Sequence, residues 1–268
     1  MIEYSSKKQS FLSYILLNWE YRTLVVSFVK RDLKIKYAQT FLGLLWTIIQ
    51  PAALAGVYIF FFQYVLSLKT NQPYILFVFS GVIIWNIFSS ILMQSSNSIQ
   101  QNLDLIKKMY FPKAILFFSK AAMALLDALI GWLMMLILTI VFTGTLPWYF
   151  FTSLLFYIPI VLFSLGISLL VARLAIYKRD ILIVLPFFVQ LSIWFSPVFY
   201  PVNFLPSKWS EWIMFYPLNS ILEGFRASFA LNDFSLMHVL VACVFSLIIF
   251  IIGLFFFGRS EEYLMDDL

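Results

Sequence analysis

Six stretches of the sequence are long and apolar enough to cross a lipid bilayer, and no other feature constrains the fold as strongly. They cover residues 41–65, 74–92, 115–142, 148–171, 181–200 and 237–257. A membrane-spanning helix needs about 20 mostly apolar residues to cross roughly 30 Å of hydrocarbon. Hydrophobic residues make up 62% of the chain and charged residues 12%, whereas soluble domains carry about 45–50% and 25%. We therefore expect an all-α polytopic membrane protein with about six transmembrane helices.

The positive charges predict the orientation. Fourteen of the 18 lysines and arginines share one side of the membrane if the N-terminus is cytoplasmic; only Lys69, Lys208 and Arg226 then lie outside, and Lys120 lies near the inner end of the third stretch. Cytoplasmic connections carry an excess of Lys and Arg. We therefore predict a multi-pass protein of the bacterial inner membrane with both termini in the cytoplasm. Its parts are a cytoplasmic N-terminal segment (1–40), a six-span transmembrane domain (41–257) and a cytoplasmic tail (258–268).

Residues 19–39, ahead of the first stretch, have the pattern of an amphipathic helix. The apolar positions at helical spacing are Tyr21, Leu24, Val25 and Phe28, and the basic positions are Arg31, Lys34 and Lys36. Helices of this kind lie in the plane of the membrane interface. We expect an interfacial helix here; a solvated basic leader is the alternative.

The connection at residues 95–113 is polar at first and then combines charge with apolar surface. Asn102 or Asp104 is placed to cap a short helix, and Pro112 is placed to end it. Lys107 and Lys108 stand directly before a run of apolar residues, Met109, Tyr110 and Phe111. Charge beside exposed apolar surface suits docking onto another protein. Anchoring to the membrane surface by the same residues is the alternative.

The external segment 197–232 is long and proline-containing, and yet it is rich in aromatic residues. The order Ser220-Ile-Leu-Glu223 fits a capping box, which predicts a helix from about Asn219 to Leu231. Glu223 and Arg226 are three residues apart on that helix and are placed to pair. We expect short helices that dip partly into the outer leaflet, where surrounding protein must satisfy the backbone.

The sequence lacks the motifs of an intrinsic catalytic engine. It has no G-x-x-x-x-G-K-[ST] phosphate loop and no H-E-x-x-H motif, and Cys243 is its single cysteine. We therefore predict a transport subunit that is not an enzyme and that binds no metal or cofactor itself. A membrane enzyme of glycan assembly is the alternative from a different functional class. It would need catalytic carboxylates on the cytoplasmic loops, and Asp104 and Asp180 are poor candidates for that role.

Two charged residues lie inside the third stretch. Lys120 and Asp127 are seven residues apart, which places them on one helix face about 10 Å apart along the axis. Charges within membrane spans are often functional. A structural contact between helices or between chains remains equally open for both.

Several segments, in order along the chain, resemble one family. They are KRDLKIKY at 30–37, QTFLGLLWTIIQP at 39–51, IKKMYFPKAIL at 106–116, FSPVFYPVNFLPSKW at 195–209 and YPLNSILEGFR at 216–226. Together they resemble the membrane subunit of polysaccharide ABC exporters, the permeases of O-antigen, capsule and wall teichoic acid, and most of all the O-antigen permeases. One departure is Pro217 ahead of Leu218 and Asn219, where the family pattern has Asn followed by Pro.

The resemblance implies a homodimer that binds two copies of a nucleotide-binding subunit, which hold ATP and Mg. It implies that residues 95–113 form a coupling helix, that 19–39 form the interface helix and that 197–232 form a periplasmic gate. The residues carried over for contact with the partner ATPase are Lys107, Lys108, Met109, Tyr110, Phe111, Pro112, Tyr177, Lys178, Arg179 and Asp180. Those of the interface helix are Arg31, Asp32 and Lys34, and those of the gate are Pro201, Trp209, Glu223 and Arg226.

The chain carries 31 Phe, 14 Tyr and 8 Trp, more than interfacial anchoring alone needs. The resemblance implies a channel lined with aromatic side chains, on which the apolar faces of sugar rings can stack. The candidates are Trp46, Tyr58, Trp85, Trp194, Phe199 and Tyr200; an interfacial belt or lipid contact is the alternative for each. We expect outward transport of undecaprenyl-linked polysaccharide, with O-antigen as the first candidate. A permease for a small lipid or drug is the runner-up.

Overall fold

The computed structural model describes residues 11–38, 41, 43–67, 73–231 and 235–261, and no strand occurs among them. The longer helices are α2 (Arg22–Tyr37), α3 (Trp46–Tyr58), α4 (Tyr74–Ser96), α7 (Ala114–Thr143), α8 (Tyr157–Tyr177), α9 (Asp180–Ser192) and α12 (Leu236–Glu261). The shorter ones are α1 (Phe11–Glu20), α5 (Ser98–Gln101), α6 (Leu103–Lys108), α10 (Ser207–Met214), α11 (Pro217–Ala227), the π-helical η2 (Ile59–Val65) and the 3-10 turns η1 (Gly43–Leu45), η3 (Phe150–Phe156), η4 (Ile193–Phe195) and η5 (Val202–Phe204). The expected all-α fold class is confirmed.

Five helical segments of the described chain are long and apolar enough to span a membrane. They are Trp46–Val65, Tyr74–Gln101, Ala114–Thr143, Phe150–Tyr177 and Leu236–Glu261. The stretch predicted at 181–200 forms a shorter apolar helix, Asp180–Phe195. It ends early because the chain turns at Ser196, where φ is −108° and ψ is 136°, and Pro197 follows without an N–H to continue the helix.

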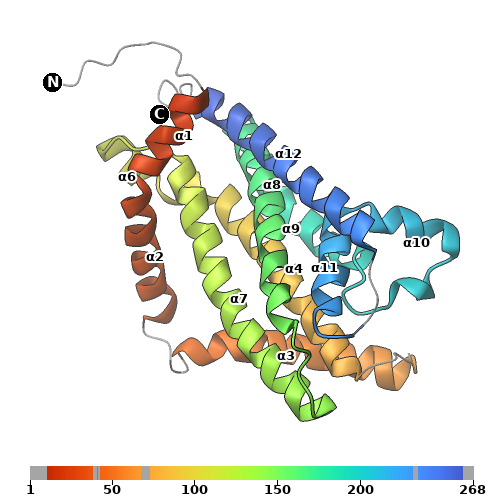
Figure 1. Ribbon diagram of the computed structural model, residues 1–268. Helices are drawn as coiled ribbons and strands as arrows, with labels where there is room; N and C mark the ends of the chain where they lie inside the picture. The colour runs from red at the N-terminus through yellow and green to blue at the C-terminus, as the bar shows by residue number, and fades with distance from the viewer. Residues whose placement is uncertain (1–10, 39–40, 42, 68–72, 232–234, 262–268) are drawn as a thin grey trace.

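The centre of the bundle is α4, which is buried on nearly all sides by α7, α8 and the elements after α9. Figure 1 shows α4, α7, α8 and α12 running roughly side by side. Glycines let α8 and α12 approach closely: a Cβ added at Gly253 would lie 2.5 Å from the Gly166 carbonyl oxygen. Small residues at such crossings are the usual means of tight helix packing in membranes.

The segment predicted as the first span lies differently from the others. Gly43, with φ of +50°, turns the chain after α2, and α3 then crosses the ends of α4 and α7 instead of running alongside them (Figure 1). It contacts both helices but is largely exposed within the single chain. An apolar segment with so little internal cover leaves a broad surface for lipid or for another chain.

The amphipathic segment predicted at 19–39 is two helices. The break falls at Tyr21, between α1 and α2, and α2 packs lengthwise against α7. Most of the predicted helix is present as α2, but part of its basic side faces α7, where Lys36 lies 2.6 Å from Asp127. One end of the molecule holds the start of α1, the end of α12 and α6 (Figure 1). This arrangement is consistent with the prediction that both termini lie on the same side of the membrane.

Candidate functional site

The connection between α4 and α7 is built from short pieces. The short helix predicted to begin near Asn102 is confirmed as α6, but it ends at Lys108, ahead of Pro112. The rest of the predicted coupling helix at 95–113 is corrected: it consists of the end of α4, α5 and a chain that is extended at Met109. Asn102 precedes α6 but its side chain does not cap it. Its amide nitrogen donates to the Ser98 carbonyl at 2.7 Å, and its amide oxygen accepts from Arg31 of α2 at 2.9 Å. This amide holds the connection against α2.

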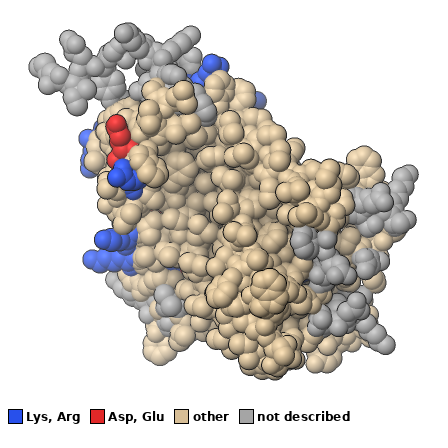
Figure 2. All heavy atoms as spheres, viewed as in Figure 1, with Lys and Arg blue, Asp and Glu red and all other residues tan. Residues whose placement is uncertain are grey.

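The residues predicted to contact a partner ATPase divide into an exposed and a buried set. Lys107, Lys108, Met109 and Tyr110 are exposed. In Figure 2 charged side chains gather over α6 and α2, and further Lys or Arg atoms lie near the top of the view. Pro112 is buried, and Phe111 is only 1% exposed. The ring of Phe111 packs on that of Phe28, with centroids 5.7 Å apart. Phe111 therefore anchors the segment and is not available for docking, which corrects that part of the expectation.

The second predicted contact with the partner, the turn between α8 and α9, is exposed throughout. Its residues are Tyr177, Lys178, Arg179 and Asp180. Asp180 begins α9, where a negative charge is favourable beside the positive end of the helix dipole. Because the sequence predicts that this turn and residues 107–110 lie on the cytoplasmic side and contact a partner, we call them the cytoplasmic docking residues.

A buried carboxylate that sequence reasoning missed joins three parts of the chain. Glu261, at the end of α12, accepts a hydrogen bond from the Tyr14 hydroxyl at 2.6 Å and one from the Lys113 backbone at 2.9 Å. The Lys113 ammonium lies 3.1 Å from the same carboxylate. Burial, and then the charge of Glu261, hold the pKa of Tyr14 well above its usual range, so this hydroxyl stays a donor. Lys113, the residue just before α7, is thereby held to α12 through Glu261, and Glu261 in turn is held to α1 through Tyr14.

Lys120 and Asp127 do not bind each other; both bind α2. The Lys120 ammonium lies 2.7 Å from Asp32, and the Lys36 ammonium lies 2.6 Å from Asp127. Asp32 also accepts from Arg31 at 2.9 Å. Of the residues expected in the interface helix, Arg31 and Asp32 thus join this ion-pair network, and Lys34 is exposed. Both intramembrane charges have the structural contact between helices that the sequence left open.

Arg226 is the centre of the segment that the sequence predicts as an external gate, and it is fully buried, at 0% exposure. The predicted pairing with Glu223 is confirmed at 2.8 Å. Its guanidinium also donates to the carbonyls of Pro197, Val198 and Phe77 at 2.7, 2.8 and 3.0 Å, and it lies 3.6 Å from the centre of the Phe77 ring. One planar fork of donors therefore satisfies the irregular backbone after α9 and ties it to α4.

Gly81 of α4 allows that backbone to approach. A Cβ there would lie 2.6 Å from the Val198 carbonyl oxygen and 2.8 Å from Arg226 Nη2. The hydroxyl of Tyr74, at the start of α4, donates to the Phe199 carbonyl. The segment following α9 is thus held at two points of one helix.

The predicted capping box at Ser220 is wrong. α11 begins at Pro217, which stands in the first helical turn, where its fixed φ suits a helix start. The Ser220 hydroxyl donates back to the Met214 carbonyl, and the helix ends at Ala227, not near Leu231. Of the other gate residues, Pro201 precedes η5, and Trp209 is 64% exposed on α10.

Four of the six aromatic candidates come together. Phe199 lies at the centre, with ring centroids 4.8 Å from Tyr58, 4.9 Å from Trp194 and 5.6 Å from Tyr200. Trp194 is exposed, and Tyr58 and Tyr200 are half-buried. Phe199 is only 1% exposed, and Trp85 is buried elsewhere in α4 against Phe88. Those two support the fold from inside and present no face to a passing ligand in the single chain.

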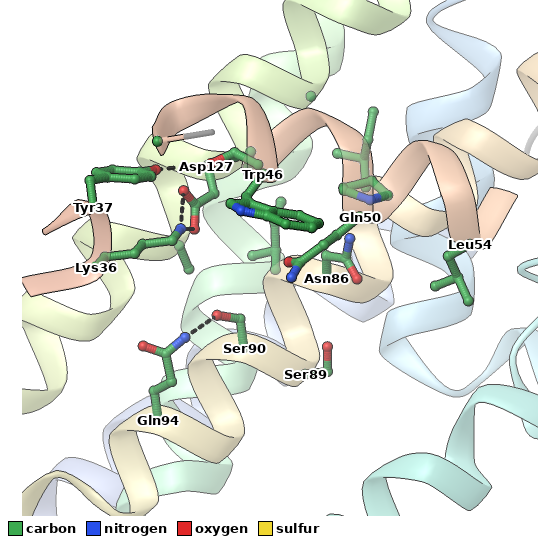
Figure 3. A pocket seen from close by; sticks show the side chains of 18 residues that line it. Lys36, Tyr37, Trp46, Gln50, Leu54, Asn86, Ser89, Ser90, Gln94 and Asp127 are labelled. Carbon is green, nitrogen blue, oxygen red and sulfur yellow. Dashed lines mark hydrogen bonds and ion pairs between the residues drawn. The ribbon is translucent and has the colours of Figure 1, made fainter. Parts of the chain in front are cut away.

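The sixth candidate, Trp46, lines a pocket of about 540 Å³ between α3, α4 and α7. Small-molecule sites commonly measure roughly 300–1,000 Å³. Its polar lining residues are Lys36, Tyr37, Thr47, Gln50, Asn86, Ser89, Ser90, Gln94 and Asp127, most of them labelled in Figure 3. The sequence held one sign of this site: Asn86, Ser89, Ser90 and Gln94 recur at helical spacing within an apolar span.

Comparison with known proteins identifies the family. A family model described as ABC-2 type transporter matches residues 23–230. The chain is 26% identical over 240 residues to an O-antigen export system permease protein of Klebsiella pneumoniae, covering 89% of this chain and 92% of that protein. It is 27% identical over 217 residues to one from Myxococcus xanthus (79% and 82% covered) and 23% identical over 246 residues to the polysialic acid transport protein of Escherichia coli (88% and 93% covered). The resemblance to polysaccharide export permeases is confirmed, and the chain belongs to the ABC-2 type transporter family.

Proposed function

We propose that this chain is the membrane-spanning subunit of an ATP-driven exporter that carries undecaprenyl-linked polysaccharide, O-antigen in the first place, out across the inner membrane. The observation that carries the proposal is similarity over most of both chains to two O-antigen export permeases. The channel is formed by a homodimer. Much of the apolar surface of α3 is left uncovered by the described residues, which supports a second copy as its neighbour.

Energy comes from two copies of a separate nucleotide-binding subunit, which hold ATP and Mg. The cytoplasmic docking residues receive that partner, because Lys107 and Lys108 stand beside exposed Met109 and Tyr110. Force on α6 reaches the bundle through hydrogen bonds to α2 and α12. Asn102 bonds to Arg31 of α2, and Lys113 bonds to Glu261 of α12.

The path to the outside runs through α4 and α12. α12 packs on α8 and α11, and α4 holds the gate backbone through Gly81, Tyr74 and the guanidinium of Arg226. A rigid shift of either helix therefore moves residues 196–199 and α11 together. The coupling is mechanical and needs no chemistry within this chain.

Reversing two docking charges should separate insertion from transport. For Lys107→Glu with Lys108→Glu we expect surface polysaccharide to fall by about tenfold or more, because like charges placed across an interface repel strongly. Chain levels in the membrane should be unchanged. The matched control, Arg22→Glu with Lys30→Glu, changes the charge equally at exposed positions of α2 and should export normally. Normal export by the docking variant would refute the docking assignment.

Deletion of the gene in the native host tests the function itself. We expect surface polysaccharide to disappear while lipid-linked polymer accumulates inside, because synthesis continues without export. Loss of both pools, with transferase activity in the purified chain, would favour an enzyme of glycan assembly. Unchanged polymer in both places would refute polysaccharide export and favour a small lipid or drug as substrate.

A further inference from the structure

The pocket beside Trp46 contains polar groups that the described part of the chain leaves without partners. No hydrogen bond engages the side-chain amides of Gln50 or Asn86 in that part of the chain, and Figure 3 shows both facing the same space. Gln94 donates to the Ser90 hydroxyl at 2.7 Å, which leaves its amide oxygen available. Polar groups among apolar spans are costly unless something satisfies them. Gln50 and Gln94 are exposed in the described chain and Asn86 is half-buried, so water or a ligand can reach all three amides.

The charges of the pocket are already balanced. Lys36 and Asp127 are its charged lining residues in the described chain, and the ammonium lies 2.6 Å from one carboxylate oxygen and 2.7 Å from the other. Phosphate groups are held by unpaired cations or by converging backbone N–H groups. Nothing of this kind lines the pocket among the described residues. Its ligand should be neutral.

The remaining lining combines amides and hydroxyls with one aromatic face. Amides offer both donors and acceptors, and so do the serine hydroxyls. In Figure 3 the Trp46 ring projects from α3 toward Gln50 and Asn86, and these residues meet in one pocket. A sugar has the same two aspects, hydroxyl groups around its rim and an apolar C–H face, so it suits this lining better than a hydrocarbon does.

From these contacts we propose that the pocket is a subsite which hydrogen-bonds neutral sugar residues of the glycan in transit, and not its pyrophosphate. The inference rests on the proposed function. The helix that carries Trp46 also carries Tyr58, twelve residues further along and so about 18 Å away. Tyr58 belongs to the aromatic cluster around Phe199, beside the gate backbone. α3 thus connects the subsite, at Trp46, to the gate, which Tyr58 contacts through Phe199.

Photo-crosslinking in the native host tests the subsite directly. A photoreactive amino acid replaces Gln50 or Asn86, and Leu133, which is 53% exposed on α7 outside the pocket, serves as the control position. We expect adducts that react with antibody to the surface polysaccharide from positions 50 and 86 and none from 133. Adducts that carry lipid without sugar, or only a second copy of this chain, would overturn the proposal, as would the absence of any adduct.

Substitutions distinguish failure of the subsite from failure of the function. Gln50→Leu with Asn86→Leu should lower export by about tenfold, since each lost hydrogen bond contributes modestly, with chain level and thermal unfolding midpoint unchanged. Gln50→Ser with Asn86→Ser, which keeps hydrogen-bonding groups, should recover much of it. Full export by the leucine variant, in a host where gene deletion still abolishes surface polymer, would overturn the subsite and leave the proposed function standing.

Discussion

Arg226→Leu is expected to lose about 3–5 kcal/mol of stability, the usual cost of leaving one member of a buried ion pair behind. The leucine removes the cation that lies 2.8 Å from the buried Glu223 carboxylate, and it removes the donor to the Pro197 and Val198 carbonyls. Those carbonyls follow α9, where no helix can satisfy them. The measurements are the thermal unfolding midpoint of the purified chain and the fraction of chain in the membrane.

Two companion variants attribute the loss to these contacts. Arg226→Lys keeps the charge but lacks the planar fork that reaches several carbonyls at once, so we expect an intermediate loss. Arg226→Leu with Glu223→Gln removes both charges and should be more stable than Arg226→Leu alone, since the two residues share one network. A midpoint equal to that of the native chain for Arg226→Leu would contradict the role of the guanidinium in holding the backbone after α9.

Gly253→Ala is expected to destabilise the chain by about 1–3 kcal/mol, the range of overpacking in a tight core. The new Cβ would lie 2.5 Å from the Gly166 carbonyl oxygen. Because that atom belongs to the backbone of α8, rotation of a side chain cannot relieve the clash. α8 and α12 must move apart, which would also weaken the packing of α12 against α11. The thermal unfolding midpoint again reports the effect.

The matched control for this variant is Gly56→Ala on α3. Beyond the backbone of its own helix, no atom of the described chain lies within 4 Å of a Cβ added at Gly56, and alanine favours a helix over glycine by about 1 kcal/mol. Its midpoint should be unchanged or slightly higher. Equal midpoints for Gly253→Ala and Gly56→Ala would contradict the close crossing of α8 and α12.

Local pattern was sufficient for the features that depend on neighbouring residues. The apolar stretches predicted the positions of five long helices, because span length and hydropathy need no knowledge of partners. The pairing of Glu223 with Arg226 followed from a spacing of three on one helix. The exposure of Lys107 and Lys108 could be predicted because these two charged residues stand just before a turn that contains a proline.

The tertiary structure alone decided what each face meets. Lys120 and Asp127 lie on one helix face as expected, but their partners Asp32 and Lys36 come from about 90 residues away. Phe111 and Phe199 looked like surface aromatics and are buried, because Phe28 and Tyr58 pack on them. Ser220 had the spacing of a cap and bonds to Met214 instead.

The pocket shows which features the sequence predicts and which only the tertiary structure reveals. Asn86, Ser89, Ser90 and Gln94 mark a polar stripe on α4 from the sequence alone, but the stripe does not reveal that Gln50 and Trp46 of α3 complete it. Periodicity records which side of a helix is polar and nothing about what that side faces. Contacts between distant segments depend on how whole helices pack. At Gly81 and Gly253 the backbone of another segment comes close, and a single sequence does not predict which segment that is.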